Sequence, residues 1–144
     1  MLRDLYSNVG PVQLLKPATY TSDQNSASVD LQNFNSCVLG AMVGASGDTL
    51  SGSVYILLEL EESDDNSTWS DCADASLSAA VSGLNTGTFA KIDDAAEDEA
   101  MYFVGYKGNK RYVRVVLNVV GTHTNGTPAG LFAIKGDAEK LPIQ

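Results

Sequence analysis

The stretch AMYFVGYKGNKRYVRVVLNVV, residues 100–120, carries the pattern that decides the fold class. From Arg111 to Val120, apolar residues recur at every second position and β-branched residues dominate, which is typical of a β-strand. Ala100 to Tyr106 forms a second such run, and the Gly108-Asn109 pair between them suits a tight turn with positive φ. The stretch therefore predicts a β-hairpin in which Val113 and its alternate neighbours point one way.

The same alternation recurs along the chain. Ser36 to Val43 places Cys37 and every second residue after it on one face, and Ser53 to Glu61 does the same from Val54 onward. Both are predicted as central strands. A last strand is expected at Ala129–Gly136, and shorter strands are expected at Val12–Leu15, Ala27–Leu31 and Thr88–Ile92. No segment keeps the helical period, so at most one or two helical turns are expected, around 74–80 and 93–100.

About seven short antiparallel strands, separated by turns rich in Gly, Asn, Asp and Ser, predict an all-β fold. The expected architecture is an antiparallel β-sandwich of the jelly-roll or immunoglobulin-like kind. A length of 144 residues corresponds to one domain that can bury a real core. We expect a single domain over residues 1–144, with an N-terminal arm at about 1–11 and a short C-terminal tail at 137–144.

The charge balance excludes some partners. Nine basic and eighteen acidic residues give a net charge of -9, which repels phosphate backbones, so no nucleic-acid partner is expected. No apolar stretch approaches the roughly 18 residues needed to cross a bilayer, so no membrane partner is expected either. The first residues lack the features of a secretory signal, and we expect synthesis in a bacterial host cytoplasm.

The residues that carry chemistry are sparse. The chain has one histidine, His123, in a loop rich in Gly, Thr and Asn, and its two cysteines, Cys37 and Cys72, have no metal-ligand spacing. Nucleotide-binding and nucleophile motifs are absent. The acidic run 61–68 lacks the glycine and the final glutamate of a calcium-binding loop, which favours a solvated turn over a calcium site. The sequence predicts no enzyme, no cofactor and no metal site.

The positions that alternate with the predicted core are also apolar, whereas a solvated sheet face carries polar residues there. Two interpretations remain open: a second layer of the same chain covers these side chains, or they form a subunit interface. The candidate interface residues lie in the N-terminal arm and on the strand faces: Leu2, Leu5, Tyr6, Val38, Met42, Tyr55, Leu57, Tyr112 and Val116.

Four stretches, taken in order, resemble a known family. They are SVDLQNFNS (28–36), EESDDNSTWSD (61–71), VGYKGNKRYVRV (104–115) and AIKG (133–136). Together they are similar to small virion proteins of tailed bacteriophages and related prophages, encoded among the head genes. The resemblance implies a capsid decoration or cement protein that binds the major capsid protein on the outer surface of the head and stabilises it. A neck, tail or fibre-attachment protein is the alternative within the virion.

The resemblance also implies partners. Decoration proteins often sit on local threefold axes, so a homo-oligomer, with a trimer preferred, is expected to bind the major capsid protein or another virion protein. A hypothesis from a different class is a carbohydrate-binding module on a receptor-binding appendage, because β-sandwiches often bind sugars. The flat rings available for that role are Tyr55, Trp69, Tyr102, Tyr106 and Tyr112.

Overall fold

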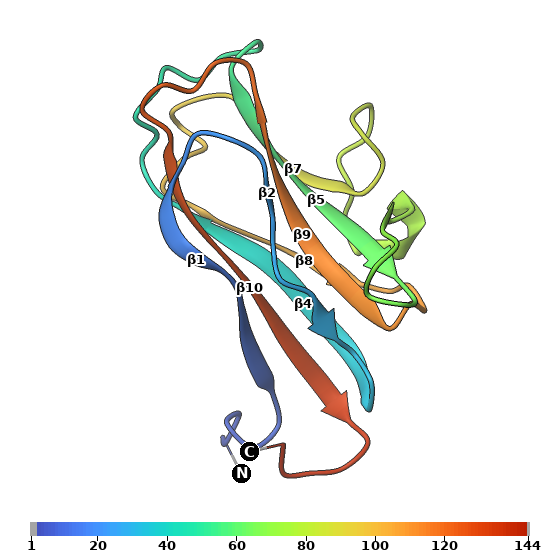
Figure 1. Ribbon diagram of the computed structural model, residues 1–144. Coiled ribbons are helices and arrows are strands. Elements are labelled where there is room, and N and C mark those ends of the chain that lie inside the picture. Colours follow the sequence, from blue (N-terminus) through green and yellow to red (C-terminus); the bar gives the residue numbers. More distant parts are fainter. Residues whose placement is uncertain (1–2, 144) are drawn as a thin grey trace.

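The computed structural model describes residues 3–143 and shows two antiparallel sheets packed face to face (Figure 1). Sheet A contains four strands, in the order β1 (Gly10–Tyr20), β10 (Thr127–Ala138), β4 (Phe34–Val43) and β8 (Met101–Tyr106). The predicted all-β sandwich is confirmed.

Sheet B contains six strands, three of them only two residues long. Its order is β2 (Gln24–Asn25), β9 (Tyr112–Val120), β5 (Tyr55–Ser63) and β6 (Ser70–Asp71), with β3 (Val29–Asp30) also paired to β9 and β7 (Thr88–Ile92) also paired to β5. Within residues 3–143 the one helical segment is a 3₁₀ turn, Asp74–Ser76, and no helix forms at 93–100. No helix of this part of the chain has the length and apolar content to cross a membrane.

The core lies between the sheets and follows the predicted alternation. On β4, Cys37 and Leu39 are buried, together with the alternate residues that follow them. On β5 and β9, the inward positions are filled by aliphatic side chains such as Leu58 and Val115, both fully buried. Branched aliphatic residues pack well on a pleated surface. Of the predicted inward set, Val54 and Val119 at the strand ends are only half-buried.

The predicted hairpin of residues 100–120 is wrong. β8 pairs with β4 in sheet A and β9 pairs with β5 in sheet B, so the segment between β8 and β9 crosses from one sheet to the other. Two neighbouring strands with apolar inward faces can pair side by side or face each other across a core, and alternation alone does not distinguish these arrangements. Gly108 lacks positive φ; its missing side chain makes room for the Tyr106 side chain, whose hydroxyl oxygen a Cβ would meet at 2.3 Å.

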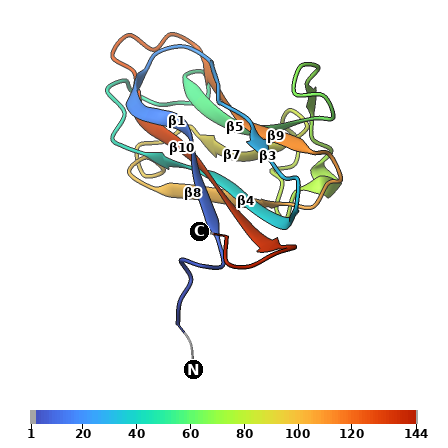
Figure 2. The ribbon, with the colours of Figure 1, turned by 60° about the horizontal axis from the view of Figure 1, so that its bottom comes forward.

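The C-terminal end of the described chain returns to the start of sheet A, where the Ile143 N–H donates to the Ser7 carbonyl at 3.0 Å. The segment Arg3–Val9, called the arm below, leads away from the body of the sandwich in Figure 2. It forms a turn, since the Asn8 N–H donates to the Leu5 carbonyl at 3.0 Å and the Asn8 side chain donates to the Asp4 carbonyl at 2.7 Å.

Candidate functional site

The strand register of sheet A gathers apolar side chains on its outer face. Met42 pairs with Met101 on one side and with Gly130 on the other. One row further along, Gly40 pairs with Phe103 and Phe132. We call the resulting surface the sheet A face, and it comprises Pro11, Met42, Met101, Phe103, Phe132 and Ile134.

Large parts of these side chains are exposed. The exposed fraction is 58% for Met42, 56% for Met101, 65% for Phe103 and 37% for Ile134. With about 200 Å² for a large side chain, these four residues alone expose on the order of 400 Å². A patch of that size is comparable to the largest on a typical monomer, and such patches are often binding sites.

Part of the sheet A face is hollowed into an open groove of about 980 Å³ over β1 and β10, and Met42 and Met101 also line it. The groove forms because β1 is irregular: its pairing with β10 shifts register between Gln13 and Leu15 and again between Leu15 and Ala18. Edge strands tolerate such bulges and prolines, and β1 is an edge strand. Every residue lining the groove is uncharged.

The outer face of sheet B is different, because the chain covers it with its own polar side chains. Arg114 pairs with Glu61 at 2.5 Å and lies over the Trp69 ring, 4.4 Å from its centre. Lys91 lies 4.6 Å from the centre of the Tyr55 ring in the same way. Trp69 and Tyr55 therefore each have one face occupied, which argues against these rings as sugar-stacking platforms.

A buried carboxylate also belongs to this outer layer of sheet B. Glu59 on β5 is 5% exposed and accepts hydrogen bonds from Asn85 Nδ2 at 3.0 Å, from Thr88 Oγ1 at 3.1 Å and from Asn118 Nδ2. Buried polar groups are stable when hydrogen-bonded, and this carboxylate has three donors. The network fixes the segment before β7 against β5, so this face is closed within one subunit.

The nine predicted interface residues are separated by the structure. Met42 lies on the sheet A face, and Val38 lies half-buried beside it. Tyr55 and Tyr112 are half-buried on sheet B, where Leu57 and Val116 are only 4% and 5% exposed and present little area to a partner. In the arm, Leu5 and Tyr6 are exposed, and Leu2 lies outside the described residues.

Most of the side chains that form the sheet A face are not among the residues predicted from the sequence. Met101 and Phe103 alternate with the buried Val104 on β8, and Phe132 and Ile134 alternate with buried residues on β10. The sequence did carry one sign of this face, because both the inward and the outward positions of β8 and β10 are apolar. That sign points to one exposed face only when the pairing of β8 with β4 is known.

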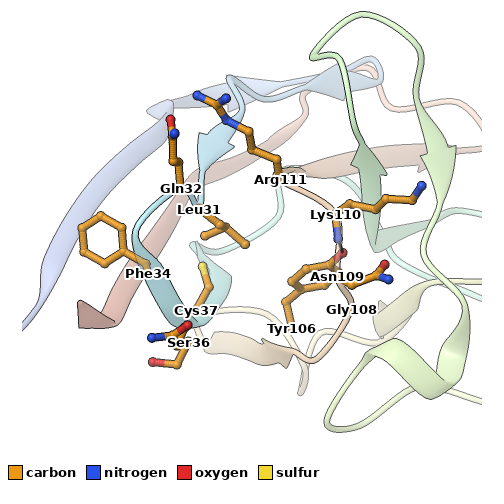
Figure 3. Close-up of a pocket in the computed structure, with 11 residues that line it drawn as sticks. Leu31, Gln32, Phe34, Ser36, Cys37, Tyr106, Gly108, Asn109, Lys110 and Arg111 are labelled. Atoms are coloured by element: carbon orange, nitrogen blue, oxygen red, sulfur yellow. Dashed lines mark hydrogen bonds between the residues drawn. The ribbon is translucent and has the colours of Figure 1, made fainter. Parts of the chain in front are cut away.

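A second, smaller hollow of about 400 Å³ lies between the segment 31–37, which leads into β4, and the segment 106–111, which leads from β8 to β9 (Figure 3). In Figure 3, Leu31 and Cys37 lie on one side of this hollow and Tyr106 on the other, while Lys110 points away from it. Burial raises the pKa of the Cys37 thiol to about 12, so the thiol stays protonated at neutral pH and is a poor nucleophile.

The cations around this second hollow are already paired. Arg111 donates two hydrogen bonds to the Asp30 carboxylate, at 2.9 and 2.8 Å, and Lys110 pairs with Asp64. The Arg111 guanidinium holds the pKa of Asp30 below its usual value, which keeps the pair ionised. An anionic ligand would have to displace these carboxylates, so the hollow is a weaker candidate than the sheet A face.

The loop around His123 is packed rather than loose. His123 is buried, its Nε2 lies 3.1 Å from the Val120 carbonyl oxygen, and its Nδ1 lies 3.8 Å from Asp48. Asp48 accepts backbone hydrogen bonds from Asn125 and its neighbours, and these donors lower the pKa of its carboxyl group. Within residues 3–143, no three side chains of metal-binding type form a cluster.

Asp65 organises the acidic run 61–68, for which the sequence favours a solvated turn over a calcium site. Its carboxylate accepts hydrogen bonds from the backbone N–H groups of Ser67 and Thr68, at 2.9 and 2.7 Å, and from the Ser63 hydroxyl at 2.9 Å. These donors hold the pKa of Asp65 far below its usual value. The carboxylate therefore has the role of a turn-forming acceptor.

Comparison of the chain with protein-family models, with curated proteins and with solved structures finds no match. The likeness to phage virion proteins accordingly rests on the four sequence stretches described above.

Proposed function

We propose that this protein is a non-enzymatic structural subunit that binds other protein subunits through the sheet A face. The observation that carries the proposal is the contrast between the two outer faces. Sheet B is closed by ion pairs and by the hydrogen bonds of Glu59, whereas sheet A presents Met42, Met101 and Phe103 uncovered. An exposed apolar face of this kind is typical of a surface that a partner protein covers.

The charge distribution supports this role. The chain carries a net charge of -9, yet the residues that line the groove are all uncharged. Charges are depleted at the centres of protein interfaces, because burying an unpaired charge is costly. The remaining acidic surface keeps the free subunit soluble and lets the apolar face associate without carrying charge into the contact.

For the assembly itself we propose the particle of a tailed bacteriophage, with this protein as a decoration or cement subunit on the outer surface of the head. The four sequence stretches that resemble phage virion proteins support this assignment. The acidic balance suits the outside of a particle better than the interior filled with DNA, which repels a protein of this charge. The proposed partners are further copies of the chain, as a trimer, and the major capsid protein.

Immunogold labelling of particles from the phage or prophage that encodes the chain tests this function. We expect gold on the heads, and label on necks or tails would replace the head assignment by an attachment role. Particles that stay unlabelled, although the chain is expressed, would contradict the virion assignment.

The role of the face is tested on the same particles with substituted chains. Phe103→Glu places a charge on the sheet A face and is expected to reduce head labelling at least about tenfold, as expected for loss of an interface anchor. Val81→Glu, at an exposed apolar residue outside this face, is the matched control and should label like the wild type. Equal labelling by the two variants would remove the sheet A face from the docking role.

A further inference from the structure

The loop between β9 and β10 contains Asn125-Gly126, the one place in the sequence where glycine follows asparagine. Glycine has no side chain to shield its backbone nitrogen, so this pair can react with itself. The Gly126 nitrogen bonds to Asn125 Cγ and loses its proton, and Nδ2 leaves with that proton as ammonia. Water then opens the resulting cyclic imide at either carbonyl, which leaves aspartate or isoaspartate at position 125.

The structure engages both reacting groups in hydrogen bonds. The Gly126 N–H donates to Asp48 Oδ2 at 2.7 Å, and Asn125 Nδ2 donates to the Gly47 carbonyl at 2.9 Å. Closing the cyclic imide breaks both bonds, because the Gly126 nitrogen gives up its proton and Nδ2 departs. A charge-assisted hydrogen bond such as the one to Asp48 is about twice as strong as a neutral one. The folded chain therefore has to lose these contacts before the pair reacts.

The charge of Asp48 opposes the reaction as well. Its carboxylate also accepts hydrogen bonds from the backbone N–H groups of Asn125 and Thr124, at 3.0 and 3.1 Å, and these donors hold the pKa of its carboxyl group below the usual value. Asp48 is therefore ionised at neutral pH, and negative charge that develops on the Gly126 nitrogen meets a like charge. So acidic a carboxyl group is also too weak a base to take a backbone amide proton.

We propose that Asn125 is a deamidation site that Asp48 keeps unreacted in the folded chain. The packing of the Asn125 loop against the loop at 44–50 holds this arrangement in place. Gly126 is buried with a φ of +79°, and a Cβ there would meet a backbone carbonyl oxygen at 2.7 Å. Across the contact, the Gly47 N–H donates to the Gly126 carbonyl at 2.9 Å. Asn125 therefore reacts only when the two loops separate.

After deamidation the two loops cannot close in the same way. Asn125 Nδ2 donates to Asp48 Oδ1 at 3.3 Å, and both products carry a carboxylate at position 125 in place of this amide. Two neighbouring carboxylates repel each other, and the Gly47 carbonyl loses its donor. Because ammonia has left, refolding does not reverse the reaction. The product therefore marks those copies of the chain in which the loops have separated.

Deamidation of the purified full chain tests the role of Asp48. The chain is incubated at mildly alkaline pH, and peptide mass spectrometry measures aspartate and isoaspartate at position 125. The folded wild type should react at least about tenfold more slowly than the same chain in denaturant, because the charge-assisted hydrogen bond on the reacting N–H contributes about that factor. Asp48→Ala should remove most of this protection. Asp48→Asn keeps the size of the side chain and removes its charge, so it should also react faster than the wild type.

Two controls separate a local effect from general unfolding. Asp65→Ala removes another carboxylate that accepts two backbone N–H bonds in a turn, and it should react at Asn125 like the wild type. Within the Asp48 variants, deamidation at Asn66, in that other turn, should keep its wild-type rate. Three results would overturn the inference: a folded wild type that reacts as fast as the denatured chain, Asp48 variants that react no faster than the wild type, or an equal acceleration at Asn66.

Discussion

If the interface lies on sheet A and sheet B is covered by the chain itself, two apolar residues should contribute very unequally to the stability of the single chain. Leu57 on sheet B is almost fully buried, so Leu57→Ala should lower the free energy of unfolding by about 3 kcal/mol, within the usual range for buried leucines. Phe103 on sheet A has only a third of its surface covered, about 70 Å², so Phe103→Ala should cost about 1 kcal/mol after the area still covered by alanine is allowed for.

Guanidinium unfolding followed by Trp69 fluorescence measures both costs. With a denaturant slope of about 4 kcal/mol per molar, the midpoint should fall by about 0.7 M for Leu57→Ala and by about 0.25 M for Phe103→Ala. The wild-type midpoint should also rise with protein concentration, because association stabilises the folded subunit, and Phe103→Ala should weaken that dependence. A larger midpoint shift for Phe103→Ala than for Leu57→Ala at low concentration would instead mean that Phe103 is packed within the single chain and that Leu57 is not.

Three further predictions concern the fold. Gly87→Ala should destabilise the protein by more than about 1 kcal/mol, because φ at Gly87 is +86° and a Cβ there would meet backbone oxygens at 2.8 and 3.0 Å. A Cβ at Gly52 would lie in open space, so Gly52→Ala should leave the stability nearly unchanged in the same unfolding assay. Cys37 and Cys72 should stay unreactive toward a thiol reagent at pH 8 until denaturant is added, because burial raises the pKa of both thiols; fast labelling of the native protein would contradict this. The pKa of the Asp65 carboxyl group is lowered in the folded state, so this carboxylate stabilises the fold fully above the pKa of the unfolded chain and loses that effect as the pH falls below about 4. The melting temperature of Asp65→Asn should therefore fall less between neutral pH and pH 3 than that of the wild type. An equal fall in the two proteins would be the contrary result.

Local patterns predicted the strands and the inward residues well. Thr88–Ile92 is a strand with the predicted bounds, and Cys37 and Leu39 are buried as the alternation on β4 requires. Side-chain alternation is a property of a single strand, so it survives any choice of pairing partner. That is why the core could be read from the sequence before the sheets were known.

Pairing could not be read in the same way. The segments 100–106 and 111–120 have the pattern of a hairpin, but β8 and β9 belong to opposite sheets. The sequence left two interpretations open for the outward residues Leu57 and Val116, cover by the same chain or a subunit interface, and the structure buries both within one copy of the chain. Phe103 was missed because Gly40, the residue that it pairs with on β4, comes from a strand distant in the sequence.

Site-specific photo-cross-linking in particle-producing cells shows which outer face binds a second protein chain. A benzophenone amino acid in place of Phe103 reports on the sheet A face, and the same group in place of Tyr55 reports on sheet B. If sheet A is the interface, position 103 forms a covalent adduct with a second protein chain and position 55 forms none. Adducts from position 55 alone would place the interface on sheet B instead.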